Sequence, residues 1–268
     1  MEFKQVITDT NEVVLQESGT YLFQITDHAQ IHIQVKPNIT VNLLVEIDQK
    51  EDLQVSITVE QDATCRAFLM HNTQGYIEET HTLKENASLY IATAELSRGT
   101  MSHKATYNLE KSGATLEARY AYVSDEEDRK ELHVYADHQS PNTSSNLELY
   151  GVMKKNAKLK AEVSSHIVNG AHQAAAHQTS RILNFDGNVS AEVSPILLID
   201  EDDVSASHAC SMGAVDENHL YYLQSRGLSA DAAIALIVNG YLAVLAETFT
   251  EAELQEIILE EIHKKAGV

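Results

Sequence analysis

The feature that most constrains this chain is a period-two alternation of apolar and polar residues over much of its length. Ile31, Ile33 and Val35 alternate with polar neighbours, and the same pattern runs through residues 39–47 and 53–59. Such alternation predicts a β-strand with one buried face. A composition rich in Thr, Val, Ile and Tyr continues to about residue 213, after which Ala, Leu and Glu dominate. We therefore expect many short strands over residues 1–213 and helices over residues 214–268.

A loose internal repeat joins a turn residue to an alternating strand. The copies begin at Asn86, Gly113, Asn156, Gly187 and Asp203, and the spacings between them are 27, 43, 31 and 16 residues. Units of this kind cannot close a core alone and must stack on neighbours. Two architectures fit: a β-helix and an antiparallel sandwich. The repetition favours the β-helix, and the irregular spacing weakens that preference.

The sequence after residue 213 predicts helices with recognisable ends. Asp216 can cap a helix that runs through Leu223 to Arg226, with Gly227 at the left-handed C-terminal position. Ser229 can cap a second helix, whose apolar residues recur at three- and four-residue spacing. A third helix is expected to begin near residue 250.

Charge narrows the choice of partners. The chain has 19 Lys and Arg against 40 Asp and Glu, a net charge of −21. Phosphate binding needs a basic face, so we expect no nucleic-acid partner and no docking on an anionic membrane. No run of about 18 apolar residues predicts a membrane span, and the N-terminus lacks the order of a signal peptide. Cys65 and Cys210 form neither a disulfide framework nor a CxxC pair. A soluble cytoplasmic protein is expected.

Histidines suggest a metal site only weakly. The chain has 13, but none belongs to an HExxH or a His-x-His pattern, so scattered surface and core histidines are the simpler interpretation. His208 and Cys210 indicate a site more specifically. They lie two residues apart on a predicted strand, so their side chains would point to one face. Together they could ligate iron or sulfur. On residue chemistry alone, a satisfied histidine and a structural thiol remain the favoured alternative. The other histidines that cluster in sequence are His166, His172 and His177.

Motifs for catalysis are absent. The sequence contains no Walker A, no G-x-G-x-x-G and no G-x-S-x-G. A β-helix can carry carbohydrate-active sites, but these need paired carboxylates in a groove, and the chain has no Trp for sugar stacking. A carbohydrate-active enzyme is therefore the weakest of the hypotheses.

Three segments between residues 177 and 247 carry a family resemblance. The first is His177-Gln-Thr-Ser-Arg-Ile-Leu, and the second is Ser205-Ala-Ser-His-Ala-Cys-Ser-Met-Gly-Ala-Val-Asp-Glu. The third is His219-Leu-Tyr-Tyr-Leu-Gln-Ser-Arg-Gly-Leu, followed by Leu236-Ile-Val-Asn-Gly-Tyr. These resemble the patterns Q-T-N-x-x-L-L, C-S-H-G-A-T-V-G-x-L-D-E and L-F-Y-L-x-S-R-G-I of the SufB/SufD family of iron–sulfur cluster assembly proteins.

The resemblance implies a right-handed parallel β-helix followed by a small C-terminal α-helical region. It implies that the helices dock a SufC-like ABC ATPase and that β-helices pair, here with a SufB-like chain or with a second copy of this chain. No tightly bound cofactor is expected, but a transient iron–sulfur cluster or iron would lie near the dimer interface, in contact with His208 and Cys210. The residues assigned to the ATPase-docking region are Leu220, Tyr221, Tyr222, Leu223, Arg226 and Gly227.

Departures from the family patterns refine the assignment. Ala206 stands where SufD-type chains often have Cys, whereas His208 matches the family's His. Arg181 stands near the position of the sulfur-accepting Cys of SufB-type chains, and Arg cannot replace a thiolate. The chain therefore looks like a short, non-catalytic SufD-type subunit without the N-terminal helical domain of typical members. The alternative is a structural ATPase-binding module that contacts neither iron nor sulfur. Residues 1–50 would cap the β-helix or pair with the partner, and capping is preferred.

Overall fold

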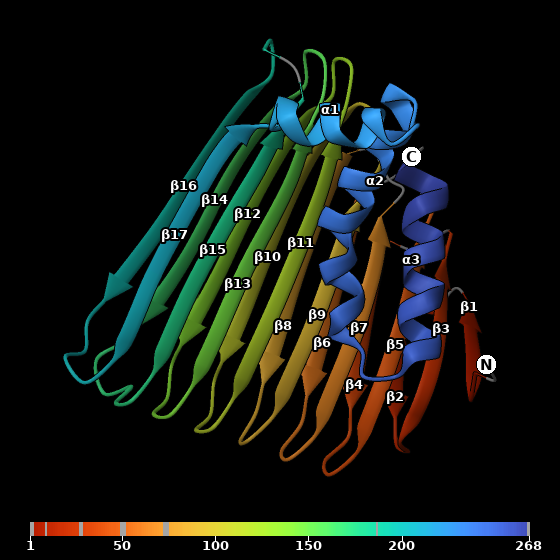
Figure 1. Cartoon of the computed structure of the whole chain (residues 1–268). Coiled ribbons are helices and arrows are strands. Elements are labelled where there is room, and N and C mark those ends of the chain that lie inside the picture. Colours follow the sequence, from red (N-terminus) through yellow and green to blue (C-terminus); the bar gives the residue numbers. More distant parts are fainter. Residues whose placement is uncertain are drawn as a thin grey trace.

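The computed structural model describes residues 3–8, 10–26, 29–48, 52–71, 75–185 and 187–266. In this part of the chain, successive strands alternate between two sheets that coil as a parallel β-solenoid (Figure 1). The nine-stranded sheet contains β1 (Gln5–Thr8), β3 (Gly19–Ile25), β5 (Thr40–Ile47), β7 (Thr64–His71), β9 (Ser88–Glu95), β11 (Thr115–Ser124), β13 (Ser144–Met153), β15 (Ala175–Asn184) and β17 (Ser205–Ala214). The eight-stranded sheet contains β2 (Glu12–Leu15), β4 (Gln30–Val35), β6 (Leu53–Val59), β8 (Gly75–Leu83), β10 (Thr100–Leu109), β12 (Arg129–His138), β14 (Lys158–Ile167) and β16 (Ser190–Ile199).

Strand pairing decides between the two architectures that the repeats allowed. Each strand pairs with the strand one coil away, and all the pairings between described strands are parallel. The β-helix is therefore confirmed, and the antiparallel sandwich is wrong. The described strands within residues 1–50 join the same ladders, because β1 pairs with β3 and β2 pairs with β4.

The uneven spacing of the sequence repeats has a structural cause. Each coil contains two turns, and the copies in the sequence belong to both kinds. Asn86 and Gly113 precede strands of the nine-stranded sheet, whereas Asn156 and Gly187 precede strands of the eight-stranded sheet. The turns before β5, β7, β9, β11, β13 and β15 recur every 24 to 31 residues, and each contains a residue with positive φ. These residues are Asn38, Asp62, Asn86, Gly113, Asn142 and Gln173.

The main core fills the interior of the solenoid. The inward-facing residues are apolar at most positions, and Ile33, Leu43, Ile57 and Leu69 are fully buried. A second core lies between the outer face of the nine-stranded sheet and the C-terminal helices, where Phe68 and Met70 pack with helical Leu and Ile residues. Several strands of this sheet are consequently buried on both faces along part of their length.

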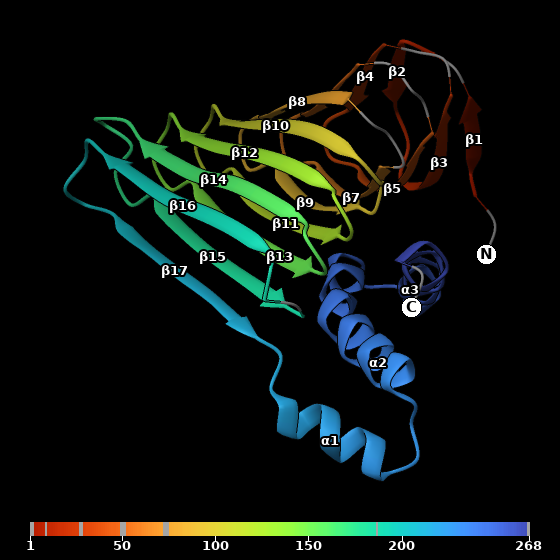
Figure 2. The ribbon, with the colours of Figure 1, turned by 90° about the horizontal axis from the view of Figure 1, so that it is seen from above.

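The C-terminal region contains α1 (Glu217–Ser225), α2 (Ala230–Leu242), the 3-10 helix η1 (Ala243–Thr248) and α3 (Ala252–Ala266). The predicted caps are confirmed: the Asp216 side chain accepts from the Asn218 amide, and the Ser229 side chain accepts from the Ala232 amide. Figure 1 shows α2 and α3 lying over the nine-stranded sheet, and Figure 2 shows α1 extending away from the solenoid beyond β17.

The segment Ala230–Thr248 is long and apolar enough to cross a membrane, with a mean hydropathy of 1.5 over an 18-residue window. From the sequence, a helix was expected here and no membrane span. In this structure Val238, Leu242 and Leu245 are buried in the second core, so one side of the segment packs on the sheet as a core helix does.

Candidate functional site

Strand β17 forms an open edge of the solenoid. It is the last strand of the nine-stranded sheet, and among the described strands it forms a ladder with β15 alone. All ten of its residues are exposed. An edge strand presents unpaired N–H and C=O groups that can pair with another chain. Figure 2 shows β17 lying at the end of the coil opposite β1.

The backbone hydrogen bonds identify which groups of β17 face the open side. The Ser205 amide donates to the Ala174 carbonyl at 3.0 Å, and the Val215 amide donates to the Asn184 carbonyl at 3.0 Å. In a parallel ladder, alternate residues direct both backbone groups toward the same neighbour. The odd-numbered residues of β17 therefore bond to β15, and the even-numbered ones, 206 to 212, face the open side.

The neighbouring edge strand, β16, is a poorer template. The Ser190 amide donates to the Ala157 carbonyl at 3.1 Å, so the even-numbered residues of β16 bond to β14. Pro195 is odd-numbered and has no N–H to offer at the open side, as is typical of edge strands. Strand β16 also carries a charge at Glu192, whereas β17 (SASHACSMGA) contains no charged residue except the titratable His208. A long edge strand without Lys, Arg, Asp or Glu lacks the usual protection against pairing.

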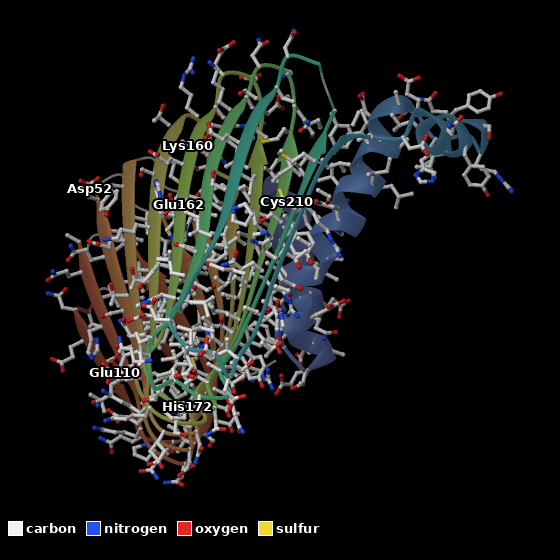
Figure 3. The ribbon with its side chains drawn as sticks, turned by 90° about the vertical axis from the view of Figure 1, so that its left-hand side faces the viewer. Asp52, Glu110, Lys160, Glu162, His172 and Cys210 are labelled. Atoms are coloured by element: carbon white, nitrogen blue, oxygen red, sulfur yellow. The ribbon has the colours of Figure 1, made fainter. Side chains whose placement is uncertain are left out.

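His208 and Cys210 lie on this edge strand, on the same face. They are in register with Gln178 and Ser180 of β15, whose side chains are buried inside the coil. The two side chains therefore point toward the open end of the interior, and both are exposed. Figure 3 labels Cys210 on β17. Partial burial raises the pKa of the Cys210 thiol, so the isolated chain carries it protonated at neutral pH.

The other histidines that cluster in sequence do not join this pair. His166 lies 2.9 Å from Asp137 and 3.2 Å from Asp200, between carboxylates on the outside of the solenoid. His172 pairs with Glu201 in a turn, and His177 contacts the Ser207 hydroxyl at 2.8 Å. Each has its own polar partner, which agrees with the simpler interpretation of the histidines in this segment.

Helix α1 carries most of the residues assigned to ATPase docking. It has no buried residue. Tyr221 and Tyr222 are 74% and 55% exposed, and the Arg226 guanidinium lies 5.2 Å from the centre of the Tyr222 ring. Gly227 adopts a φ of 97°, as the predicted C-terminal turn requires. The two remaining predicted residues, Leu220 and Leu223, are half-buried.

Arg181 lies where β15 contacts helix α2. It is exposed on β15, and its carbonyl accepts a hydrogen bond of 2.6 Å from the Tyr241 hydroxyl of α2. Its guanidinium lies 5.9 Å from the Tyr150 ring, which in turn packs edge-on against Tyr241. Position 181 thus helps to hold α2 on the outer face of the sheet.

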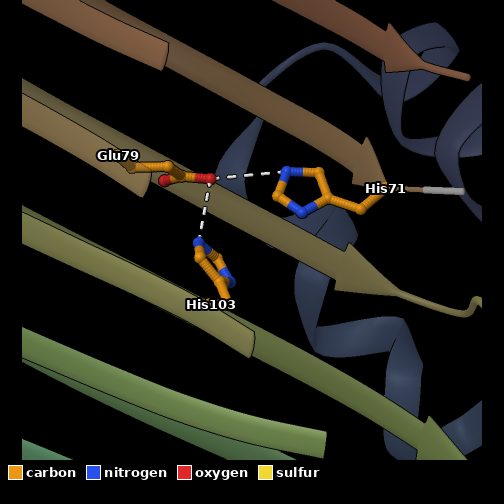
Figure 4. A group of neighbouring side chains, drawn as sticks. All are labelled: His71, Glu79 and His103. Atoms are coloured by element: carbon orange, nitrogen blue, oxygen red, sulfur yellow. Dashed lines mark ion pairs between the residues drawn. The ribbon is translucent and has the colours of Figure 1, made fainter. Parts of the chain in front are cut away.

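Sequence reasoning missed a polar cluster inside the solenoid. His71, Glu79, His81 and His103 are all fully buried, and Figure 4 shows His71 and His103 directed at one carboxylate oxygen of Glu79. Strand parity could have identified these residues. In β8, Glu79 and His81 share the inward-facing parity of Ile77 and Leu83. A titratable side chain that falls on the apolar face of a strand is expected to be buried, which is uncommon and marks the position as a candidate site.

Comparison with known proteins identifies the family. The model of the family described as "SUF system FeS cluster assembly, SufBD core domain" matches residues 14–241. The iron–sulfur cluster assembly protein SufD of Bacillus subtilis is 39% identical over 116 residues, which cover 43% of this chain and 26% of that protein. The iron–sulfur cluster assembly protein SufB of the same organism is 26% identical over 214 residues, 77% of this chain and 44% of SufB. A SufBD family protein of Mycobacterium leprae is 25% identical over 240 residues, 88% of this chain and 26% of its own length. The chain thus spans less than half the length of these relatives.

Proposed function

The chain belongs to the SufBD family of iron–sulfur cluster assembly proteins, and from this premise we propose that it is a cytoplasmic, non-catalytic, SufD-like subunit of an assembly complex. It pairs with a SufB-like chain, or with a second copy of itself, through the solenoid, and it docks a SufC-type ABC ATPase through α1. The 39% identity to SufD over the aligned stretch, against 26% to SufB over a longer one, supports the SufD-like assignment.

The observation that carries this proposal is the open, uncharged edge of β17. Exposed apolar side chains accompany it: Met212 is 51% exposed on β17, and Leu198 and Ile199 are 51% and 38% exposed on β16. Backbone groups supply affinity when a strand is added to a sheet edge, and apolar neighbours exclude water from the new contact. A second SufBD chain, either a SufB-like chain or another copy of this one, is the partner proposed for this edge.

Substitution of Ala206 tests this pairing. Its N–H faces the open side, so Ala206→Pro removes one donor to the partner without breaking a bond to β15. We expect Ala206→Pro to weaken binding of the SufB-like chain, or self-association, about 10-fold, as loss of one hydrogen bond and a local clash would do. Ala206→Ser keeps the N–H and is the matched control. Light scattering under anaerobic conditions measures the complex, and equal binding by both variants would contradict the role of this edge.

We assign ATPase docking to α1 because the aromatic side chains of this helix stay exposed: nothing else in the described part of the chain buries them. Interfaces are enriched in Tyr and Arg, which supply large contact areas at low entropic cost. We expect Tyr222→Ala to abolish co-purification with the SufC-type ATPase and the accompanying rise in ATPase rate. Val6→Ala is the control, since Val6 is 53% exposed at the other end of the solenoid. Unchanged binding by Tyr222→Ala would remove α1 from the proposal.

A transient cluster or iron contact at His208 and Cys210 is the third part of the proposal. One chain offers one imidazole and one thiol at this edge, whereas iron–sulfur clusters take up to about four protein ligands. The partner strand must therefore supply the remaining donors, which is consistent with a site that forms only at the interface. His208→Ala should lower cluster formation by the full complex while complex formation continues. Unchanged cluster formation would remove this role from His208.

A purely structural module is the second candidate, and the state of the thiol favours it. The Cys210 thiol is protonated at neutral pH in the isolated chain, because burial raises its pKa, and Cys65 is buried in the core. In this alternative, the double change His208→Ala with Cys210→Ser leaves ATPase binding, ATPase stimulation and cluster formation unchanged. Loss of cluster formation alone would exclude it.

A further inference from the structure

The interior cluster joins the two sheets across the solenoid. His71 is the last residue of β7 in the nine-stranded sheet, whereas Glu79 lies in β8 and His103 in β10 of the eight-stranded sheet. All three side chains are fully buried. The Oε1 atom of Glu79 lies 3.3 Å from His71 Nε2 and 3.2 Å from His103 Nε2 (Figure 4). The three donor atoms therefore converge on one point inside the coil.

These donor atoms lack hydrogen bonds of good geometry. Within the described residues, Glu79 Oε1, His103 Nε2 and both ring nitrogens of His71 are buried without a hydrogen-bond partner, although they lie within ion-pair distance of one another. Burying polar atoms without partners costs free energy. An arrangement that repeats this cost at several convergent atoms is unusual for a group whose only role is packing.

The residue types also match a metal site. Two imidazoles and one carboxylate, all fully buried, provide a donor set that divalent transition metal ions use in proteins.

The two separations from the Glu79 oxygen fit such an ion, and all three donor atoms lie within 4.8 Å of one another. Metal–ligand distances near 2.0–2.1 Å in a tetrahedral site separate the ligand atoms by about 3.3 Å, and the two separations from Glu79 Oε1 are 3.3 and 3.2 Å. Two His and one Glu form a recurrent zinc-binding set that leaves a position for water. We propose that His71 Nε2, Glu79 Oε1 and His103 Nε2 bind a divalent first-row transition metal ion, such as Zn²⁺, inside the solenoid.

Neighbouring groups orient these ligands. His103 Nδ1 lies 2.8 Å from the Tyr122 hydroxyl, and this contact sets the direction in which Nε2 points. His81 Nε2 lies 3.0 Å from Glu79 Oε2, so the second carboxylate oxygen is already engaged and Oε1 is left for the ion. Partners of this kind fix the orientation of metal ligands in established sites. The site lies far along the coil from His208, and it is independent of the proposed function.

Cobalt provides the test, because tetrahedral Co²⁺ absorbs visible light strongly. The full chain is unfolded with chelator, refolded with Co²⁺ or Zn²⁺ alone, and freed of unbound metal. We expect the wild-type chain to retain one equivalent of either metal by elemental analysis, to show the tetrahedral cobalt bands and to melt at a higher temperature than the metal-free chain. Wild-type protein without bound metal and without these bands would overturn the proposal, whatever the variants do.

Two variants locate the metal. Glu79→Gln keeps the shape of the side chain and should lower the affinity for Co²⁺ at least 10-fold, as should His103→Gln. His138→Gln is the matched control, because His138 is equally buried but bonds to Thr143 and Ser145 instead; it should retain the cobalt bands. Equal cobalt content in Glu79→Gln, His103→Gln and the wild type would place the metal elsewhere and overturn the assignment.

Discussion

Because His138 is buried, we predict that the folded protein loses a measurable part of its stability in mild acid. It is the last residue of β12 and is fully buried, with Nδ1 2.9 Å from the Thr143 hydroxyl and Nε2 2.7 Å from the Ser145 hydroxyl. The Thr143 hydroxyl donates to the Ser140 carbonyl at 3.0 Å, so it accepts from Nδ1–H. Ser145 therefore donates to Nε2. This network stabilises the neutral ring, because a proton on Nε2 would break the hydrogen bond that the Ser145 hydroxyl donates to it.

The size and sign of the effect follow from the pKa. Burial, together with the charge of His166, lowers the pKa of His138 from 6.5 to about 4 against the opposing effect of Asp137. Between these two values the unfolded chain holds the proton and the folded chain does not, so stability falls as the pH falls through this window. The full loss, reached below pH 4, is about 3 kcal/mol, and at pH 5.5 it is about 1 kcal/mol.

Urea unfolding of the wild type and of His138→Gln isolates this residue from other titrating groups. Glutamine can donate to Thr143 and accept from Ser145, but it does not titrate. From pH 7.5 to pH 5.5, which stays above the isoelectric point of about 4.9, the stability difference should move by about 1 kcal/mol in favour of the variant. Parallel pH dependences of the two proteins would refute the reasoning.

Three further predictions test the coil by urea unfolding. Gly113→Ala should cost about 1–2 kcal/mol, because φ is 76° there and the added Cβ would clash with Asn86; an unchanged midpoint would count against this. Lys130→Met should cost about 3–5 kcal/mol, because the Lys130 ammonium lies 3.2 Å from the fully buried Glu95 carboxylate. Adding Glu95→Gln should restore part of that loss, and no restoration would mean that the pair does not act as a unit. Gln173→Asn should stabilise by about 0.5 kcal/mol, since Asn tolerates the φ of 59° better; a loss of stability would show that the Gln173 side chain contributes more than its backbone strain costs.

Local patterns predicted the elements of this fold well. Period-two alternation found the strands, and Asp216 and Ser229 located two helix starts, because each signal is contained within a few neighbouring residues. The coil itself was harder to recognise. Asn86 and Asn156 begin similar sequence motifs, yet the strands that follow them belong to different sheets. The spacing between such motifs therefore combines the repeats of two sheets, and the regular repeat within each sheet is hidden.

The candidate sites were predictable to different degrees. The shared face of His208 and Cys210 follows from parity, but the open edge that exposes them depends on which strand ends the coil, which is a property of the whole chain. The cluster of His71, Glu79 and His103 joins strands from both sheets. Parity marks Glu79 as inward-facing, but only the stacking of the coils brings the two histidines to it.

Hydrogen exchange at the individual amides of β17 tests the central claim most directly. In the isolated chain, the amides at 207, 209 and 211 should be protected by β15, while those at 206, 208, 210 and 212 exchange freely. On addition of the SufB-like chain, or at concentrations where the chain self-associates, the even-numbered amides should become protected and the odd-numbered ones should change little. If the complex forms and the even-numbered amides still exchange freely, β17 is not the pairing edge.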